Sequence, residues 1–351
     1  MHLSRGGFVL LKDRYGRVAK DLRVSLTDRC NLRCTYCMPA EGMDWLPSPE
    51  VLTDDELLRL IRIAVEDLGV NKIRFTGGEP LLRRSLEDII SRTAALEGPD
   101  GHPEISLTTN ALGLDKRAQA LKDAGLQRVN VSLDTVDRES YARLTRRDRL
   151  PQVLEGLKAA KAAGLSPIKV NTVAMLDENL DQSADLLDFC LEHGYQLRFI
   201  EHMPLGPKHT WRLDQMAKAS DILEILEAKY FLTPVGQRGS APAELWDVHP
   251  LGTTEQSAQN LEPLGQVGII ASVTRPFCGD CDRTRLTADG AIRSCLFSLS
   301  ETSLRDAMRQ GASDRELAEL WSLTMWQKPA GHGINDPNFI QPERLMSEIG
   351  G

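Results

Sequence analysis

The chain has 351 residues, of which 41% are hydrophobic and 26% charged, and a formal net charge of −8. This composition allows a sizeable buried core and argues against a general nucleic-acid-binding protein, which would present a basic face. No apolar run approaches the length of a membrane span, and the run Phe8–Leu11 is too short for the core of a secretory signal. We therefore expect a cytoplasmic protein that keeps its thiols reduced and binds neither nucleic acid nor a membrane.

A helix-to-strand unit recurs through the first part of the chain. Helical segments end at Gly69, Gly125, Gly164 and Gly194, and a strand rich in β-branched residues follows each glycine. The six predicted strands are Leu22–Leu26, Lys72–Thr76, Glu104–Thr109, Gln127–Ser132, Ile168–Val173 and Gln196–Ile200. Such alternation indicates parallel βαβ units, and a dinucleotide-type glycine fingerprint is absent. We therefore predict an α/β fold, a partial, open TIM-like barrel of about six βα units.

Three cysteines, Cys30, Cys34 and Cys37, lie within eight residues directly after the first predicted strand. Three close thiolates can hold a soft metal centre, and a four-iron cluster with three cysteine ligands leaves one iron open for chemistry. The spacing also fits zinc, so both interpretations stand at this point. A disulfide is disfavoured because the chain has an odd number of cysteines, seven, and no secretory signal.

Polar residues follow the carboxyl ends of the predicted strands, where α/β folds place their active sites. Singly, each is typical of a turn or a cap, but their shared position favours a binding site. They are Gly77–Pro80, Thr108–Asn110, Ser132–Asp134, Lys169, Asn171, Arg198 and Glu201–Met203. The pair Gly77-Gly78 would let the main chain approach a ligand closely, or would simply form a tight turn that Pro80 closes.

The regular pattern ends after Met203, where prolines and glycines become frequent. We predict one helix in this stretch, Ala219–Tyr230, and divide the chain into three regions. Residues 1–203 form the barrel, residues 204–264 form a connecting and covering segment, and residues 265–351 form a smaller C-terminal region.

A second cysteine group lies in the C-terminal region and comprises Cys278, Cys281 and Cys295. Between its members, Asp289-Gly290 predicts a hairpin that would bring the three thiols together. The group would hold a second cluster with an open iron, or a zinc ion with a fourth ligand such as His249 or His332.

Two arginines, Arg283 and Arg285, lie two residues apart on the strand after Cys281, so their side chains share one face. Paired arginines suit a phosphate, although a solvated edge strand is the plainer interpretation. The chain ends in Gly350-Gly351, which by default predicts a frayed terminus.

Taken together, these motifs resemble a known family. Cys30-x3-Cys34-x2-Cys37 with an aromatic residue before the third cysteine, followed by Gly77-Gly-Glu-Pro80, is similar to the radical S-adenosylmethionine superfamily. The second cysteine group around Arg283-x-Arg285 and the terminal Gly-Gly resemble one branch, the GTP 3′,8-cyclase family, which opens molybdenum cofactor biosynthesis. The resemblance runs from about Asp21 to the last residue.

The resemblance implies two [4Fe–4S] clusters, one on each cysteine group. The open iron of the first would bind S-adenosylmethionine, and that of the second would meet the guanine base. Family positions that contact S-adenosylmethionine match Tyr36, Gly78, Ser132, Arg198 and Met203. Those that contact the nucleotide match Arg23, Arg74, Thr108, Lys169, Arg283, Thr284 and Arg285. Catalytic roles are implied for Arg23, Arg283, Arg285, Gly350 and Gly351, whose tail would insert into the active site.

The implied reaction converts GTP to (8S)-3′,8-cyclo-7,8-dihydroguanosine 5′-triphosphate. A 5′-deoxyadenosyl radical takes the hydrogen from C3′ of the ribose, and the C3′ radical adds to C8 of guanine. The resemblance also implies an electron donor, a homodimer, and transfer of the product to a cyclic pyranopterin monophosphate synthase. One departure from the family pattern is the segment Pro204–Lys208. Alternatives are a radical enzyme that acts on a peptide or another nucleotide, and a zinc-stabilised binding module.

Overall fold

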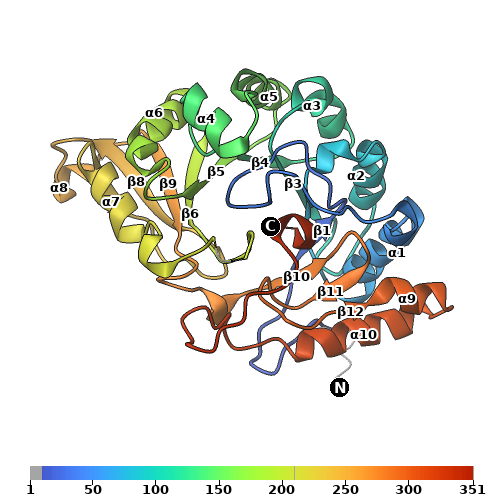
Figure 1. Cartoon of the computed structure of the whole chain (residues 1–351). Coiled ribbons are helices and arrows are strands. Elements are labelled where there is room, and N and C mark those ends of the chain that lie inside the picture. The colour runs from blue at the N-terminus through green and yellow to red at the C-terminus, as the bar shows by residue number, and fades with distance from the viewer. Residues whose placement is uncertain (1–9, 209, 351) are drawn as a thin grey trace.

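A computed structural model describes residues 10–208 and 210–350 of the chain. The described residues form one sheet of twelve strands, in the order β12-β11-β10-β1-β2-β3-β4-β5-β6-β9-β8-β7. The sheet curves into an open barrel, and helices cover its outer surface (Figure 1). The fold is thus the predicted α/β class with an open barrel.

The six predicted strands are confirmed, each to within one residue at either end. They are β1 (Asp21–Ser25), β2 (Lys72–Thr76), β3 (Glu104–Thr109), β4 (Arg128–Ser132), β5 (Ile168–Ala174) and β6 (Gln196–Glu201). Neighbours in this series pair in parallel. Parallel pairing brings the carboxyl ends of all six strands to one mouth of the barrel, where the polar residues that follow them can converge.

Two further strands join the parallel set, a pairing that the sequence pattern did not indicate. β9 (Gly265–Ile270) pairs with β6, and β10 (Arg283–Leu286) pairs with β1 in a register that places Arg285 opposite Arg23. Because β10 also pairs with β11 on its other side, it is not an edge strand. The interpretation of Arg283 and Arg285 as a solvated edge is therefore wrong.

Antiparallel strands complete both ends of the sheet. The turn at Asp289-Gly290 joins β10 to β11, which pair antiparallel as predicted. The end strands are β7 (Tyr230–Pro234), β8 (Glu244–Pro250), β11 (Ala291–Arg293) and β12 (Thr302–Ser303). The sheet runs across the boundaries expected after residues 203 and 264, because strands from all three regions pair in it. The three-region division itself stays a prediction.

The described helices pack against the outside of the barrel, except for α11, which lies at its mouth. They are α1 (Asp54–Arg62), α2 (Leu86–Ala94), α3 (Leu114–Asp123), α4 (Arg138–Thr145), α5 (Leu150–Ala162), α6 (Ser183–His193), α7 (Ala219–Glu227), α8 (Glu255–Ala258), α9 (Leu304–Arg309), α10 (Asp314–Trp326) and α11 (Met346–Ile349). The helix predicted over Ala219–Tyr230 ends earlier, since Tyr230 begins β7. Of the described helices, none combines the length and apolarity of a membrane span.

Two apolar clusters hold the molecule together. The larger lies between the sheet and its helices and includes the fully buried Phe75, Phe199 and Trp321. The smaller joins the loop after β6 to the C-terminal helix, and contains Leu205 and Ile349 among its members. Ile349 is fully buried, and the last helix, drawn in dark red, lies at the centre of the barrel mouth (Figure 1). The last helix is therefore part of the fold.

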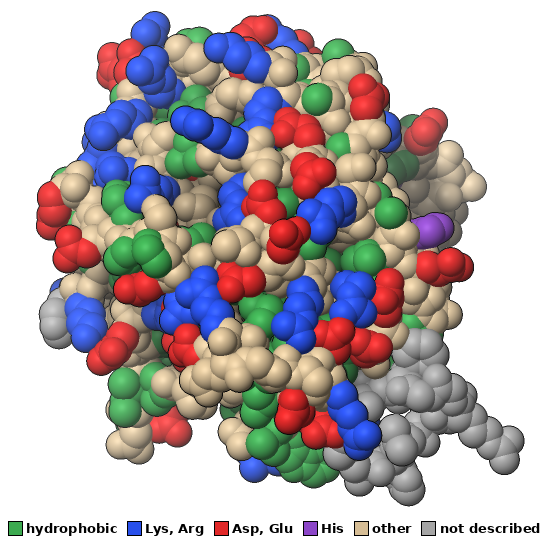
Figure 2. Space-filling view, turned by 90° about the vertical axis from the view of Figure 1, so that its right-hand side faces the viewer, with side chains coloured by type: hydrophobic (Ala, Val, Ile, Leu, Met, Phe, Trp, Pro, Cys, Tyr) green, Lys and Arg blue, Asp and Glu red, His purple; other side chains and the backbone are tan. Residues whose placement is uncertain are grey.

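The outer surface carries charges of both signs in close alternation over α1, α2 and α9 (Figure 2). Several are ion pairs between elements: Arg59 with Asp314 at 2.7 Å joins α1 to α10, and Arg309 with Glu56 at 2.7 Å joins α9 to α1. Exposed pairs of this kind contribute less than about 1 kcal/mol each. The stability of the fold therefore rests on its apolar clusters.

Candidate active site

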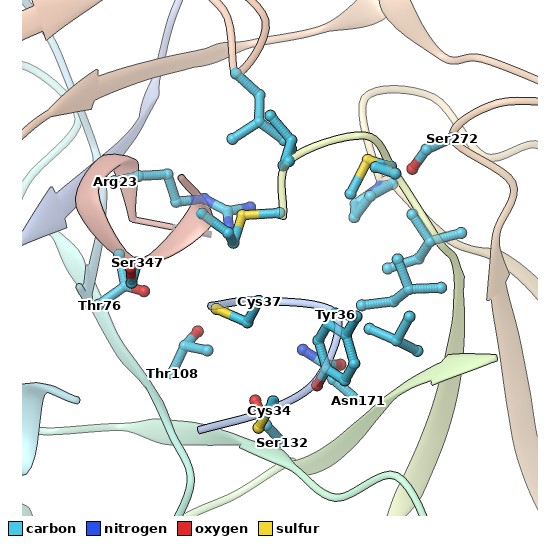
Figure 3. Close-up of a pocket in the computed structure, with 18 of the residues that line it drawn as sticks. Arg23, Cys34, Tyr36, Cys37, Thr76, Thr108, Ser132, Asn171, Ser272 and Ser347 are labelled. Atoms are coloured by element: carbon cyan, nitrogen blue, oxygen red, sulfur yellow. The ribbon is translucent and has the colours of Figure 1, made fainter. Parts of the chain in front are cut away.

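Both cysteine groups line one cavity of about 320 Å³ at the carboxyl ends of the parallel strands. Figure 3 shows Cys34 and Cys37 of the first group in this cavity, with Tyr36, Thr108 and Ser132 around them. The loop after β1 supplies the first group. The second group comes from the loop before β10 and from the residues after β11. The two groups are therefore brought together by the pairing of β10 with β1. The lining cysteines are Cys30, Cys34, Cys37, Cys278, Cys281 and Cys295.

The hydrogen-bond donors to the Cys30 sulfur of the first group are neutral. The Cys30 sulfur accepts hydrogen bonds from the main-chain N–H of Leu32 at 3.4 Å and from the amide of Asn110 at 3.8 Å. Burial raises the pKa of the Cys30 thiol to about 11 and that of the Cys37 thiol to about 12. Binding of metal to these thiols must therefore release protons, as thiolates are the ligating form.

The Gly-Gly-Glu-Pro segment after β2 fixes the position of the first cysteine loop. A Cβ atom at Gly78 would lie 2.3 Å from the carbonyl oxygen of Arg29, so only glycine allows the two loops this approach. Glu79 is fully buried and accepts hydrogen bonds from Thr109 Oγ1 and Asn110 N, both at 2.7 Å. Burial raises the pKa of Glu79 to about 7. The Gly-Gly-Glu-Pro segment thus positions the first cysteine loop and also lines the cavity.

The five residues predicted to contact S-adenosylmethionine all line the cavity: Tyr36, Gly78, Ser132, Arg198 and Met203. The Tyr36 hydroxyl donates to Asp134 at 2.9 Å, and Asp134 also accepts from Val173 N at 2.9 Å. Burial raises the pKa of Asp134 to about 6. Arg198 donates to the amide oxygens of Asn171 and Asn130 at 3.0 and 2.8 Å. Neighbouring side chains thus hold Tyr36 and Arg198 in place. The contacts of all five residues with a cofactor stay predictions.

Cations outnumber anions around the cavity. Five buried arginines line it: Arg23, Arg74, Arg198, Arg283 and Arg285. Of the ion pairs among described residues, those of this set involve one carboxylate, Asp21, which lies 3.3 Å from Arg23 and 4.0 Å from Arg74. Burial would raise the pKa of Asp21, but the surrounding guanidinium groups hold it well below its usual range.

The same imbalance affects the arginines themselves. Burial, followed by the neighbouring guanidinium groups, lowers the pKa of Arg198 and of Arg285 to about 9. The Nε atoms of Arg74 and Arg283 are buried and have no hydrogen-bond partner. Buried cations that are only partly paired are costly, so this part of the cavity is suited to a multiply charged anion.

Thr108 lines the cavity, but two other residues predicted to contact the nucleotide, Lys169 and Thr284, are not among its lining residues. Thr284 lies between Arg283 and Arg285, so its side chain faces the opposite side of β10, where it accepts a hydrogen bond from the Trp321 indole at 3.0 Å. Lys169 lies on β5, and burial with nearby arginines lowers its pKa to about 8.

The C-terminal tail reaches into the mouth of the barrel. The carbonyl oxygen of Gly350 accepts a hydrogen bond from Arg285, and Met346 N donates to Leu205 O at 2.9 Å. Gly350 has φ +70°, and a Cβ atom there would lie 2.7 Å from Ser25 Oγ. The default prediction of a frayed end is thus wrong as far as Gly350, while Gly351 lies outside the described residues.

The second cysteine group lies among cations that sequence reasoning missed. Lys328 Nζ donates to the Cys281 sulfur at 3.4 Å, and Arg17 donates to the carbonyl oxygen of Cys278. Burial would raise the pKa of the Cys281 thiol, but Lys328 and Arg283 lower it. Neither Lys328 nor Arg17 belongs to a recognisable motif, so the sequence held no signal for them.

The two histidines considered as zinc ligands have other partners. His332 Nε2 contacts Ser272 O at 2.8 Å, and His249 Nε2 contacts Thr233 Oγ1 at 3.2 Å. Within residues 10–208 and 210–350, no three His, Cys, Asp or Glu side chains are arranged to hold a single metal ion. A zinc ion with a histidine ligand therefore finds no support.

A multi-iron cluster fits the donor set of each cysteine group. Such a cluster takes soft thiolate ligands, and hydrogen bonds to the cysteine sulfurs are a usual feature of its surroundings. Each group offers three thiols on one cavity, and Cys30 and Cys281 both accept N–H···S contacts.

An open parallel barrel, a three-cysteine loop after β1 and Gly-Gly-Glu-Pro after β2 define the radical S-adenosylmethionine class. Residues 24–190 match the radical SAM superfamily, and residues 195–334 match the family Molybdenum Cofactor Synthesis C. The chain is 60% identical to the GTP 3′,8-cyclase of Corynebacterium glutamicum over 97% of its length and 89% of the relative. It is 57% identical to that of Streptomyces coelicolor, covering 99% and 98% of the two chains. The chain belongs to the GTP 3′,8-cyclase family.

Solved structures show the same fold at lower similarity. SuiB of Streptococcus suis bound to S-adenosylmethionine aligns with a TM-score of 0.59 and 16% identity, covering 90% of this chain and 68% of SuiB. At this identity the likeness concerns the fold and says nothing of the substrate.

Proposed function

We propose that the chain converts GTP to (8S)-3′,8-cyclo-7,8-dihydroguanosine 5′-triphosphate, the first step of molybdenum cofactor biosynthesis. One observation carries the assignment: five buried arginines with a single carboxylate partner surround a cavity that both cysteine groups line. A nucleoside triphosphate supplies the missing negative charge, and the names of the relatives supply the reaction.

In this proposal Cys30, Cys34 and Cys37 hold one [4Fe–4S] cluster, and Cys278, Cys281 and Cys295 hold the other. With S-adenosylmethionine bound, the first cluster would supply the single electron for reductive cleavage of the sulfonium, with methionine as the leaving group. The side chains of Tyr36, Ser132 and Met203 line the part of the cavity assigned to that cofactor.

The arginines bind and orient the triphosphate. Guanidinium groups form charge-assisted, often bidentate hydrogen bonds with phosphate oxygens, which are stronger than bonds between neutral groups. Arg23 and Arg74 come from β1 and β2, whereas Arg283 and Arg285 come from β10, so the set approaches one anion from adjacent strands. Fixing the triphosphate fixes the ribose relative to both cysteine groups, and such positioning can lower a reaction barrier substantially.

The remaining groups of the cavity exclude water and avoid competing proton chemistry. The carboxylates of Asp134 and Glu79 are engaged by hydrogen bonds. Burial lowers the pKa of His202 to about 4, so its ring is neutral. Hydrogen-atom abstraction needs no side-chain acid or base, which agrees with a cavity whose carboxylates are already engaged and whose His202 is neutral.

Four further assignments belong to the proposal. The chain takes its electron from a separate donor, acts in the cytoplasm, forms a homodimer, and transfers its product to a cyclic pyranopterin monophosphate synthase. They are supported by the family that the chain belongs to.

The test uses the reconstituted, oxygen-free protein with S-adenosylmethionine, dithionite and GTP that carries deuterium at C3′. We expect deuterium in 5′-deoxyadenosine by mass spectrometry, together with the cyclised triphosphate. Unlabelled 5′-deoxyadenosine without cyclised product would overturn the substrate and favour a radical enzyme for a peptide or another nucleotide. A protein that binds zinc and forms no 5′-deoxyadenosine would overturn the reaction class.

A further inference from the structure

A short segment after α10 closes over the second cysteine group; we call residues 328–332 the strap. Arg17 donates to the carbonyl oxygens of Pro329 and Ala330 at 2.6 and 3.1 Å, as well as to that of Cys278. At the other end of the strap, His332 Nε2 donates to Ser272 O at 2.8 Å. The strap is therefore tied to the N-terminal segment and to the loop after β9.

The strap begins with a buried lysine that points at the cysteine group. Lys328 is 3% exposed, and its Nζ atom donates to the carbonyl oxygens of Cys281 and Arg283 at 3.0 and 2.8 Å. The same atom lies 3.4 Å from the Cys281 sulfur. These three hydrogen bonds use all the donors of an ammonium group, and none of them goes to a carboxylate. They therefore satisfy the polar group without neutralising its charge.

In the first cysteine group, Arg33 donates to the carbonyl oxygen of Cys30 at 2.8 Å, but among the described hydrogen bonds no cation donates to a sulfur of this group. The donors to the Cys30 sulfur are the main-chain N–H of Leu32 and the side-chain amide of Asn110, which are both neutral. The two groups thus offer the same number of thiols to one cavity but differ by two buried cations in contact with a sulfur, Lys328 at 3.4 Å and Arg283 at 3.9 Å, of which Lys328 is the nearer.

We propose that the Lys328 ammonium raises the reduction potential of the iron–sulfur centre on Cys278, Cys281 and Cys295 above that of the centre on the first group. The inference rests on the proposed function, which places a cluster on each group. Reduction adds one electron from the external reductant, with no proton transfer and no change in bonding to the chain. A cation in a buried setting stabilises the added negative charge, and net charge with hydrogen bonds to sulfur sets cluster potentials. Lys328 is a positioning residue, because it acts through the cysteine ligand.

The test measures the potential of each centre by redox titration with electron paramagnetic resonance. Each centre is observed in full-length protein whose other cysteine group is replaced by alanine. We compare Lys328→Gln, which keeps hydrogen-bond donors without charge, Lys328→Met, which removes both, and Lys328→Arg, which keeps the charge. Lys158→Met removes a lysine charge from the exposed surface of α5 and serves as the matched control.

We expect Lys328→Gln and Lys328→Met to lower the equilibrium constant for one-electron reduction of the second centre at least tenfold, which corresponds to about 59 mV. Lys328→Arg and Lys158→Met should leave that potential close to wild type, and all four should leave the first centre unchanged. An unshifted second centre in Lys328→Gln at full iron content would overturn the inference. The inference would also be overturned if the Lys328→Gln and Lys328→Met proteins fold normally but cannot bind iron at the second group, because Lys328 would then act in cluster assembly. Failure of the unsubstituted protein to assemble the second centre would instead count against the proposed function.

Discussion

The two cysteine groups share one cavity but differ in the groups that contact their sulfurs. Around the first group the donors to sulfur are neutral, Arg33 contacts only the carbonyl oxygen of Cys30, and burial with the nearby Asp134 raises the pKa of Cys34 well above its usual value. Around the second group the neighbours are cations, and Lys328 with Arg283 lowers the pKa of Cys281 against the effect of burial. The same three-thiol pattern can therefore be given different chemistry by the residues around it. The difference also divides the cavity into one side suited to a sulfonium cation and another suited to a polyphosphate.

The largest expected effect comes from removing a cysteine ligand from one group at a time. Cys34→Ala should lower 5′-deoxyadenosine formation on the order of 100-fold or more, because loss of a ligand should exceed the effect of losing its supporting residues. Cys281→Ala should still release 5′-deoxyadenosine from S-adenosylmethionine with dithionite but should form no cyclised triphosphate. Both products are quantified by mass spectrometry together with iron content.

The control for this pair is Cys190→Ala, since Cys190 is fully buried in the main apolar cluster. It should keep both products. Wild-type formation of cyclised product by Cys281→Ala would show that the two groups do not divide the work as proposed.

A second prediction concerns the cationic side. Arg74→Met should weaken GTP binding by about 1.5–3 kcal/mol, roughly 10–100-fold in Kd. The same change should raise the melting temperature of the ligand-free protein, because it removes a buried guanidinium with an unpaired Nε and like-charged neighbours. Calorimetry of GTP binding and thermal unfolding give the two numbers.

The matched variant is Arg128→Met. Arg128 pairs with Glu104 and does not line the cavity, so its loss should lower the melting temperature and leave GTP binding unchanged. If Arg74→Met behaves like Arg128→Met in both measurements, Arg74 is a structural residue.

A third prediction tests the neutral side through pH. The pKa of Glu79 is raised from 4.5 to about 7, so between these values the folded protein holds a proton that the unfolded chain has released. The contribution to the free energy of unfolding is full below pH 4.5 and is lost as the pH rises through about 7. Between pH 5 and 7 the loss should be about 2 kcal/mol for this group. Urea unfolding of the apo-protein measures it.

Glu79→Gln should remove this component of the pH slope, whereas Asp134→Asn should remove the separate component of Asp134, whose pKa is raised to about 6. Identical slopes in wild type and Glu79→Gln would mean that Glu79 stays ionised in the folded protein.

The smallest expected effect concerns the tail that lies between the two sides. Gly350→Ala places a Cβ atom 2.7 Å from Ser25 Oγ at a φ of +70°, which should cost about 1 kcal/mol and lower cyclised product roughly fivefold. Gly331→Ala is the control, because no atom lies within 4 Å of its Cβ position. Equal rates for the two variants would exclude a positional role for Gly350.

Much of the barrel was predictable because its signals are local. Helices that end at glycine and strands of β-branched residues depend on neighbours in the sequence, and these placed all six strands. The pairing of β9 with β6 was not predictable. Gly265–Ile270 contains two glycines, which favour a loop, and its strand conformation depends on hydrogen bonding to β6. β-strand formation of this kind depends on tertiary context more than on propensity.

The candidate site divides in the same way. Six of the seven cysteines, and Arg283 with Arg285, stand in motifs of fixed spacing, and all of these residues line the cavity. Thr284 does not line the cavity, because successive side chains of a strand point to opposite faces and its two neighbours, Arg283 and Arg285, face the cavity. The sequence alone could have shown this. Lys328 could not be found, because its role comes from a fold that places the strap beside Cys281.

The pairing of β10 with β1 also bears on how the molecule is made. β1 leaves the ribosome early, and the strand that completes its outer edge, with Asp21 opposite Arg283, follows only after most of the chain has been synthesised. Until then β1 presents unpaired main-chain groups, a condition that favours association with other chains. A nascent chain of this protein therefore has a long interval of exposure to aggregation, and co-expression of a chaperone that shields sheet edges should raise its soluble yield.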